Sequence, residues 1–221
     1  EGEGVRADLL AYRITSKPLA VLANGNVNGI DVAYFSPTSV SDATRHELRA
    51  RLGLSTADFV FVFVGRLVQD KGVAELVAAF LQLVATQSHC RLLLVGPFEP
   101  ALDPLPAATL AAIEATPEIV CVGWQDDVRP YFSISTALVF PSYREGFPNV
   151  VLQAGAMGLP SIVSAINGCN EIILPDLNGV LVPSKDTVSL YEALKRFATD
   201  ADFCLHLQSH ARELILSRYE Q

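Results

Sequence analysis

Residues 59–72 read FVFVFVGRLVQDKG and decide the fold. The first six are apolar without a break, which is typical of a strand buried on both faces of a parallel sheet. A turn containing Gly65, Arg66 and Lys71 follows, and apolar residues at helical spacing continue from there to about Thr86. The stretch therefore predicts a strand, a turn and a helix that covers about Lys71 to Thr86.

The same alternation recurs along the chain, with no internal repeat. Predicted strands cover Ala20–Leu22, Phe59–Val64, Arg91–Val95, Ile119–Val122, Ala137–Phe140, Ser161–Val163 and Val180–Val182. Predicted helices cover about Asp42–Leu52, Lys71–Thr86, Leu105–Ala115, Asn149–Met157 and Thr187–Ala198. Strand–helix–strand connections are right-handed crossovers. The fold class that follows is α/β: a Rossmann-like, doubly wound, mostly parallel sheet with helices on both faces.

Composition narrows the classes of partner. The 221 residues are 50% apolar and 18% charged, as in ordinary globular proteins, and the net charge is −8. That charge argues against nucleic acid as a partner and against membrane contact through a basic patch of this segment. The apolar runs are far shorter than the roughly 20 residues that a membrane-spanning helix needs. We expect a cytoplasmic protein.

The four cysteines, at positions 90, 121, 169 and 204, lie far apart, with no C-x-x-C pair and no histidine at a ligand spacing. This spacing favours buried free thiols over disulfides. We expect no metal site and no bound cofactor.

Ligands of such sheets bind beyond the carboxyl ends of the strands, where helix N-termini gather. The turn after Phe59–Val64 places Arg66 and Lys71 at this edge. A guanidinium and an ammonium group beside a helix N-terminus suit a diphosphate. A solvated loop in which Asp70 caps the helix is the alternative.

A second turn, residues 141–149 (PSYREGFPN), follows the predicted strand Ala137–Phe140. Pro148 suits a helix start and leaves the next amides pointing outward. Glu145 could accept hydrogen bonds from sugar hydroxyls in this place, although a surface glutamate is an equal alternative. Gln153 lies about two helical turns beyond it.

A third turn, residues 164–171 (SAINGCNE), follows the predicted strand Ser161–Val163. Its Asn167-Gly168 pair can reach positive φ and present backbone donors. Taken alone, this turn is an ordinary entry into a helix.

Together, GRLVQDKG, VGWQDDVRPYF, FPSYREGFPNVVLQAGAMGLPSI and INGCNEII resemble the donor half of family 4 glycosyltransferases, which have the GT-B fold. The resemblance is strongest to the bacterial branch that builds capsule and O-antigen polysaccharides. It extends from Asn24–Asp31 to the helix that ends near Ala198. Four motifs in the right order are a more specific signal than any one of them.

The resemblance implies roles for the catalytic candidates. Arg66 and Lys71 would bind the donor diphosphate and stabilise it as it leaves, and Glu145 would hold hydroxyls of the donor sugar. The family usually places a second glutamate eight residues later, for the ribose hydroxyls. Here that position is Gln153, which can accept a hydrogen bond but has no charge.

Further donor-binding residues are implied in the same way. Trp124 and Gln125 would lie beside the base, and the loop from Asn167 to Asn170 would face the transferred sugar. The family works without a bound metal, so a helix cap explains Asp126-Asp127 better than a metal site. The donor-binding set is Gly65, Trp124, Gln125, Gly146, Phe147, Pro148, Asn149, Gln153, Asn167, Gly168 and Asn170.

The implied reaction transfers a sugar with retention from a nucleoside diphosphate, UDP by resemblance, to a glycan or polyprenyl-linked acceptor. Family members have two Rossmann-like domains. We therefore expect residues 1–16 to end the interdomain connection, residues 17–221 to form the donor domain, and an N-terminal acceptor domain to be absent from this chain. We also expect the chain to stop before the family's last helix. In the intact protein, the inner face of the membrane is a further expected location.

Two other functions stay open. A sugar-nucleotide 2-epimerase has the same architecture, and a relative that binds nucleotide sugar without turnover would fit the neutral Gln153. A dinucleotide-binding oxidoreductase would need a G-x-G-x-x-G turn, which the sequence lacks.

Overall fold

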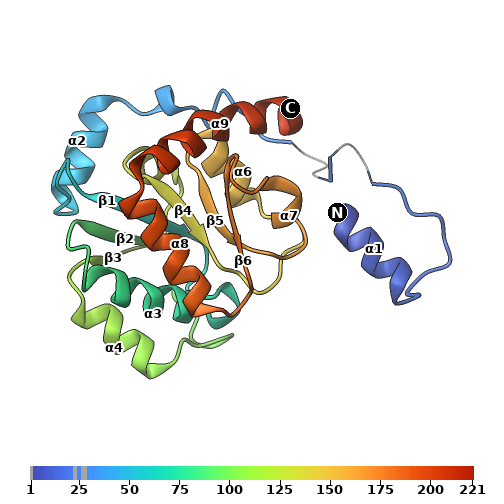
Figure 1. The fold of residues 1–221 in the computed structure, drawn as a ribbon, viewed down its shortest axis with the longest axis horizontal. Coiled ribbons are helices and arrows are strands. Elements are labelled where there is room, and N and C mark those ends of the chain that lie inside the picture. Colours follow the sequence, from blue (N-terminus) through green and yellow to red (C-terminus); the bar gives the residue numbers. More distant parts are fainter. Residues whose placement is uncertain (1, 22–23, 26–28) are drawn as a thin grey trace.

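The computed structural model describes residues 2–21, 24–25 and 29–221. Its centre is a six-stranded sheet in the order β3-β2-β1-β4-β5-β6, in which every pair is parallel (Figure 1). The strands are β1 (Phe59–Val64), β2 (Cys90–Val95), β3 (Ile119–Gly123), β4 (Ala137–Phe140), β5 (Ser161–Ser164) and β6 (Gly179–Val182). The predicted fold class is confirmed.

Helices cover both faces of the sheet. The α-helices are α1 (Glu3–Ala11), α2 (Asp42–Arg51), α3 (Val73–Val84), α4 (Ala107–Ala115), α5 (Arg129–Ser133), α6 (Asn149–Ala156), α7 (Cys169–Ile172), α8 (Thr187–Thr199) and α9 (Ala201–Tyr219), and two 3-10 turns are η1 (Pro37–Ser39) and η2 (Gln69–Lys71). On one face, α3 packs against α4 and α8; on the other, α6 packs against α9. The core lies between these layers, and the side chains of β1 and β4 are largely inaccessible to solvent.

The strand order creates one switch point, between β1 and β4. From β1 the chain continues outward to β2 and β3, whereas from β4 it continues in the opposite direction to β5 and β6. The turns that follow β1 and β4 therefore diverge to opposite faces and leave a crevice between them. The first and second predicted turns are these two.

The predicted strand Ala20–Leu22 is wrong. Ala20 and Val21 have no regular structure, and Leu22 lies outside the described residues. Among the described residues near this segment, Ile30 forms an isolated bridge with Glu220 after α9. Three apolar residues carry too little pattern to separate a strand from an extended connection.

Helix α9 was not expected, because the regular pattern was predicted to end near Ala198. Its buried residues are Cys204, Leu207, Ala211, Ile215 and Tyr219, which recur at helical spacing, while further apolar residues such as Leu205 lie outside this stripe. The helix packs tightly on α6, where a side-chain carbon at Gly155 would come within 2.6 Å of Ile215. Arg212 donates to the carbonyl groups of Val32, Phe35 and Ala156, which joins the entry segment to this layer.

The expectation of buried thiols holds for three of the four cysteines. Cys90, Cys169 and Cys204 are buried, and burial raises the pKa of the Cys169 thiol to about 12. Cys121 is exposed. It lies on the edge strand β3, where successive residues alternate between covered and open faces.

Gly72 shows how tightly the two turns are packed. Its φ of +69° is left-handed, and a side-chain carbon there would overlap the carbonyl oxygen of Pro141. Gly53 has nearly the same φ, +67°, with nothing within 4 Å of that carbon. A comparison of substitutions at Gly72 and Gly53 therefore separates the free-energy cost of a left-handed residue from the free-energy cost of a backbone clash.

We predict that Gly72→Ala lowers the free energy of unfolding by about 3 kcal/mol or more, because the two turns must move apart. Gly53→Ala should cost only about 1 kcal/mol, the strain of a left-handed alanine. Urea denaturation of both variants measures the difference. Equal costs would mean that the turns are not in rigid contact.

Candidate functional site

The first and second turns meet at the switch point through their backbones. The amide of Tyr143 donates to the carbonyl oxygen of Asp70 at 2.9 Å. Gly72 lies against Pro141 directly above the carboxyl ends of β1 and β4. The side chains of both turns therefore emerge into one crevice, as the sequence predicted.

Lys71 and Glu145 face each other across this crevice. The Lys71 Nζ atom is 2.5 Å from Glu145 Oε1, and the side chains are only 15% and 17% exposed. The buried Ser142 hydroxyl donates to the same oxygen at 2.8 Å. Among the described residues, no partner binds Glu145 Oε2. One carboxylate oxygen is thus held by the protein and the other is available to a ligand.

Arg66 lies in a cleft of about 420 Å³ next to this pair. Its lining includes Gly65, Arg66, Gly96, Glu99, Trp124 and Gln125. Arg66 Nη1 lies 3.0 Å from Glu99 Oε2, and the Arg66 side chain is 46% exposed. The hydrogen bond to Glu99 is the main reason why the pKa of Arg66 is raised, and the charges of Asp70 and Glu145 add smaller contributions. The guanidinium therefore lies among carboxylates at the floor of an open cleft.

Trp124 and Gln125 form the opposite wall of the cleft. Trp124 is 63% exposed, so its ring is open to a stacking partner. Gln125 instead turns inward and donates from Nε2 to the carbonyl oxygen of Val122 at 2.9 Å. Both residues line the cleft, and their predicted place beside the base stays a prediction.

The second turn opens helix α6 as predicted. Pro148 is the residue before its first turn, and Asn149 is its first residue. Gly168, with a φ of +78°, lies against this turn, since a side-chain carbon there would come within 2.5 Å of the Gly146 carbonyl oxygen. The half-buried Phe147 packs near Tyr219 of α9 with 5.8 Å between ring centroids. The second and third turns are therefore one packed unit.

The polar side chains of the third turn are directed toward α1. Asn167 donates from Nδ2 to Asp8 Oδ2 at 2.7 Å. The Glu171 carboxylate accepts from the amides of Glu3 and Gly4 at 2.8 and 3.3 Å, at the start of α1. Asn170 is exposed and lines a separate hollow of about 370 Å³ beside Glu3 and Arg218. The structure thus brings Gly168, but not Asn170, to the crevice.

Gln153 lies half-buried on α6, one turn after Asn149. Within the described part of the chain, its side-chain amide makes no hydrogen bond. It remains the neutral group at the position of the family's second glutamate.

Asp127 binds locally at the start of α5, but the residue that caps this helix is Val128, without a side-chain hydrogen bond, so the expected aspartate cap is not formed. Its carboxylate accepts from the amide of Arg129 at 3.0 Å and pairs with the Arg129 guanidinium at 2.7 Å. The hydrogen bond from this guanidinium is the main reason why the pKa of Asp127 is lowered. Over residues 2–21, 24–25 and 29–221, no three His, Cys, Asp or Glu side chains gather as a metal site would require.

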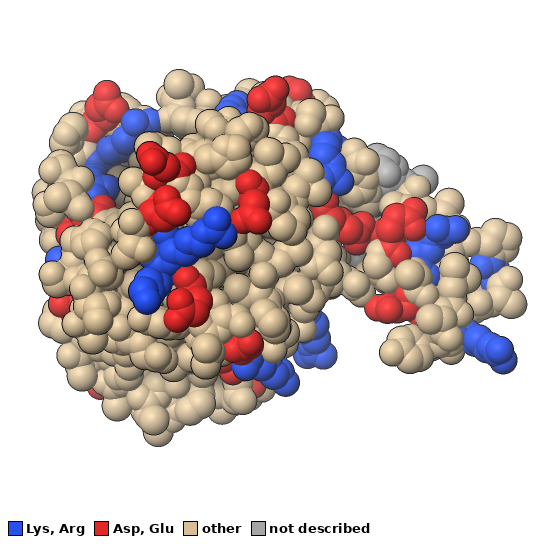
Figure 2. Space-filling view, in the orientation of Figure 1, with Lys and Arg blue, Asp and Glu red and all other residues tan. Residues whose placement is uncertain are grey.

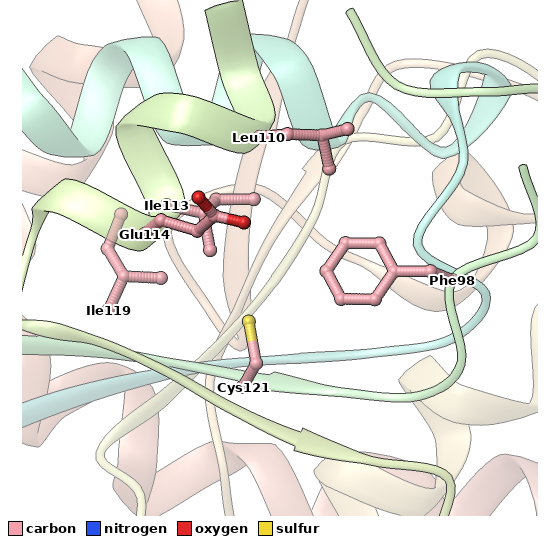
Figure 3. Close-up of a pocket in the computed structure, with 6 residues that line it drawn as sticks. All are labelled: Phe98, Leu110, Ile113, Glu114, Ile119 and Cys121. Carbon is pink, nitrogen blue, oxygen red and sulfur yellow. The ribbon is translucent and has the colours of Figure 1, made fainter. Parts of the chain in front are cut away.

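Another hollow, of about 400 Å³, lies between α4 and the edge strand β3 (Figure 3). Its lining is Phe98, Leu110, Ile113, Glu114, Ile119 and Cys121. Glu114 is the one charged side chain among these, and it is acidic, so the hollow does not suit a diphosphate. The cleft at Arg66 is the better candidate for an anionic ligand.

Surface charge is mixed on the face that Figure 2 presents, where acidic and basic side chains stand side by side. That face has no broad basic surface of the kind that nucleic acids bind. None of the described helices is both long and apolar enough to span a bilayer.

The family model described as "Glycosyl transferases group 1" matches residues 58–200. The chain belongs to the group 1 glycosyltransferases. The match includes both turns of the crevice, the Trp124 turn and the third turn. The resemblance inferred from the motifs is therefore confirmed.

Two individual glycosyltransferases are also similar to this chain in sequence. The capsular polysaccharide biosynthesis glycosyltransferase CapM of Staphylococcus aureus is 25% identical over 96% of this chain and 56% of its own length. An Escherichia coli UDP-Gal:alpha-D-GlcNAc-diphosphoundecaprenol alpha-1,3-galactosyltransferase is 29% identical over 78% of this chain and 44% of its own. The chain thus spans about half the length of these relatives.

A solved structure agrees on the fold. Sucrose-phosphate synthase from Thermosynechococcus elongatus superposes with a TM-score of 0.81 at 28% identity, over 99% of this chain and 53% of that one.

Two residues of the site were missed from the sequence. Ser142 is one of many serines in loops, and only its burial and its bond to Glu145 distinguish it. Glu99 follows a Gly-Pro turn at the end of β2, at the same edge of the sheet as the first, second and third turns. That location is the signal that could have found Glu99.

We predict that Lys71 and Glu145 are energetically coupled by about 1–2 kcal/mol, because both side chains are largely shielded from water. Urea denaturation of Lys71→Met, Glu145→Gln and the double variant measures the coupling. The exposed pair Arg196–Asp176, with side chains 50% and 66% exposed, is the matched control and should couple by less than about 0.5 kcal/mol. Similar coupling in both pairs would refute a preformed Lys71–Glu145 contact.

Proposed function

We propose that this chain is the donor-binding domain of a retaining glycosyltransferase that uses a nucleoside-diphosphate sugar, UDP-sugar by resemblance. The observation that carries the proposal is the convergence of Arg66, Lys71 and Glu145 at the switch point of the sheet. Arg66 lines the cleft and pairs with Glu99 there, Lys71 pairs with Glu145, and the Glu145 charge acts on Arg66. Among the described residues, the second oxygen of Glu145 has no partner. This combination suits a ligand that is a diphosphate at one end and a polyol at the other.

Each group has a defined task in the proposed complex. The Arg66 guanidinium and the Lys71 ammonium bind oxygens of the diphosphate, and Glu145 Oε2 accepts hydrogen bonds from sugar hydroxyls. The nucleoside extends along the cleft toward Trp124. Ser142 and Lys71 hold Glu145 in this orientation by binding its other oxygen.

The proposed chemistry is departure of the nucleoside diphosphate. Negative charge grows on the diphosphate as the bond between the sugar and its phosphate oxygen breaks, and Arg66 and Lys71 stabilise that charge. Glu145 is assigned to hydroxyl binding and Glu99 pairs with Arg66, so we assign neither carboxylate as a nucleophile. We therefore propose a same-face substitution, in which the leaving phosphate accepts the acceptor's proton.

The acceptor is proposed to be a glycan or a lipid-linked sugar in polysaccharide biosynthesis. The two relatives named above support this, since one belongs to capsular polysaccharide biosynthesis and the other is named for a diphosphoundecaprenol acceptor. Since the chain spans about half their length, we assign the acceptor site to a second domain of the full protein. No metal or resident cofactor is included in the proposal.

The rival proposal is a relative that binds nucleotide sugar without turnover, and Gln153 is the observation that favours it. A neutral amide in place of a ribose-binding carboxylate weakens hydrogen bonds to hydroxyls. Arg66, Lys71 and Glu145 favour the catalytic alternative, because a binding protein has no need to stabilise a leaving group.

We predict that the 221-residue chain binds UDP more tightly than GDP, ADP or NAD in calorimetric titrations. Arg66→Ala should weaken UDP binding about 10- to 100-fold, since it removes charge-assisted hydrogen bonds to the diphosphate. Arg196→Ala is the matched control, because Arg196 is 50% exposed and pairs with Asp176 much as Arg66 pairs with Glu99. Preferential binding of NAD, or no effect of Arg66→Ala, would contradict the assignment.

We also predict that Arg66→Ala and Lys71→Ala each lower the turnover number of the full protein by ~10²–10³, the usual loss for one transition-state contact. Sugar transfer followed by chromatography gives the rates, and NMR of the product should show a retained anomeric configuration. Binding of donor without transfer by the wild-type full protein would favour the non-catalytic alternative.

A further inference from the structure

Glu99 is held beside Arg66 by the backbone. The turn after β2 (residues 96–99) runs next to the turn after β1, and the Leu67 amide donates to the Pro97 carbonyl oxygen at 2.8 Å. Leu67 and Phe98 form a parallel bridge. A side-chain carbon at Gly96 would overlap the Gly65 carbonyl oxygen, so the two turns touch. Glu99 therefore reaches the cleft from a fixed position.

The same cleft contains the Arg66–Glu99 ion pair. Glu99 is 28% exposed, and its Oε2 atom binds one guanidinium nitrogen of Arg66, Nη1. A diphosphate that binds Arg66 would add its own negative charge within a few ångströms of the Glu99 carboxylate. The diphosphate oxygens would accept from the same guanidinium N–H group that Glu99 Oε2 now engages, so binding through Arg66 breaks its bond to Glu99. The ion pair and a bound diphosphate therefore compete.

We propose that Glu99 is the resident counter-ion of Arg66, which the donor diphosphate displaces when it binds. This inference rests on the proposed function, because it takes Arg66 to be the diphosphate ligand. Glu99 thereby weakens the binding of nucleoside diphosphates and favours release of the product after transfer. A carboxylate that only oriented Arg66 for the ligand would act in the opposite direction, so the sign of its effect on affinity decides between the two roles.

The test is calorimetric titration of the 221-residue chain with UDP, inorganic pyrophosphate and uridine. Glu99→Gln keeps the size of the side chain and removes its charge. We expect it to tighten UDP and pyrophosphate binding about fivefold, the equivalent of one exposed ion pair, and to leave uridine binding unchanged. In an Arg66→Ala background, Glu99→Gln should change the UDP dissociation constant less than twofold. Glu213→Gln, which removes one exposed carboxylate on α9, controls for net charge.

Two results would overturn the inference while the proposed function stands. The first is weaker or unchanged UDP binding by Glu99→Gln when the wild-type chain binds UDP through Arg66. The second is that Glu99→Gln tightens UDP binding as much in the Arg66→Ala background as in the wild-type chain. The second result would mean that Glu99 repels the ligand without acting through Arg66. If neither the wild-type chain nor Glu99→Gln binds UDP or pyrophosphate, the proposed function and the inference both fail.

Discussion

Lys71 and Glu145 belong to turns on opposite sides of the switch point, and the 2.5 Å contact between them joins those turns. Both charges are largely removed from water, a cost that their mutual attraction and the Ser142 hydroxyl must offset. The contact is only attainable because Gly72 lets the backbone of one turn touch that of the other. This contact fixes the two turns at the switch point, and the turn after β2 is fixed separately, by the bond from the Leu67 amide to the Pro97 carbonyl.

The third turn and helix α9, behind the crevice, are packed against these turns in the same way. Gly168 lies against the second turn, and the Tyr219 hydroxyl donates to the Glu171 carbonyl oxygen at 2.8 Å. Helix α9 therefore supports the second turn through Phe147 and the third through Glu171. Because α1 begins on the Glu171 carboxylate, the segment predicted to end the interdomain connection contacts the turn predicted to face the sugar. Movement of α1 would therefore be transmitted directly to the third turn.

The sequence predicted what depends on local pattern: the strands of the sheet and the turns with Arg66 and Glu145. Helix α9 was missed because its apolar residues lie on more than one side, among them the exposed Leu205, so the sequence shows no clean amphipathic stripe, and packing on α6 stabilises the helix. The predicted roles of Trp124 and Gln153 stay predictions. Glu99 was missed because it meets Arg66 across 33 positions of the chain, and Ser142 because its burial, unlike its short spacing from Glu145, depends on the folded chain. The partners of charged residues are non-local information.

The electrostatic state of the crevice is relevant to how an acidic protein would bind the anionic donor proposed above. Arg66 is paired with Glu99 and Lys71 with Glu145, so each cation has a carboxylate partner before any donor arrives. The proposed diphosphate then gains less ground-state attraction from Arg66 than it would from an unpaired guanidinium, because it replaces Glu99. It gains more as bond breaking adds charge to its oxygens, since the cations are already in position. Interactions that strengthen only toward the transition state raise the turnover number rather than the affinity. Cations that already have carboxylate partners therefore favour turnover over tight donor binding.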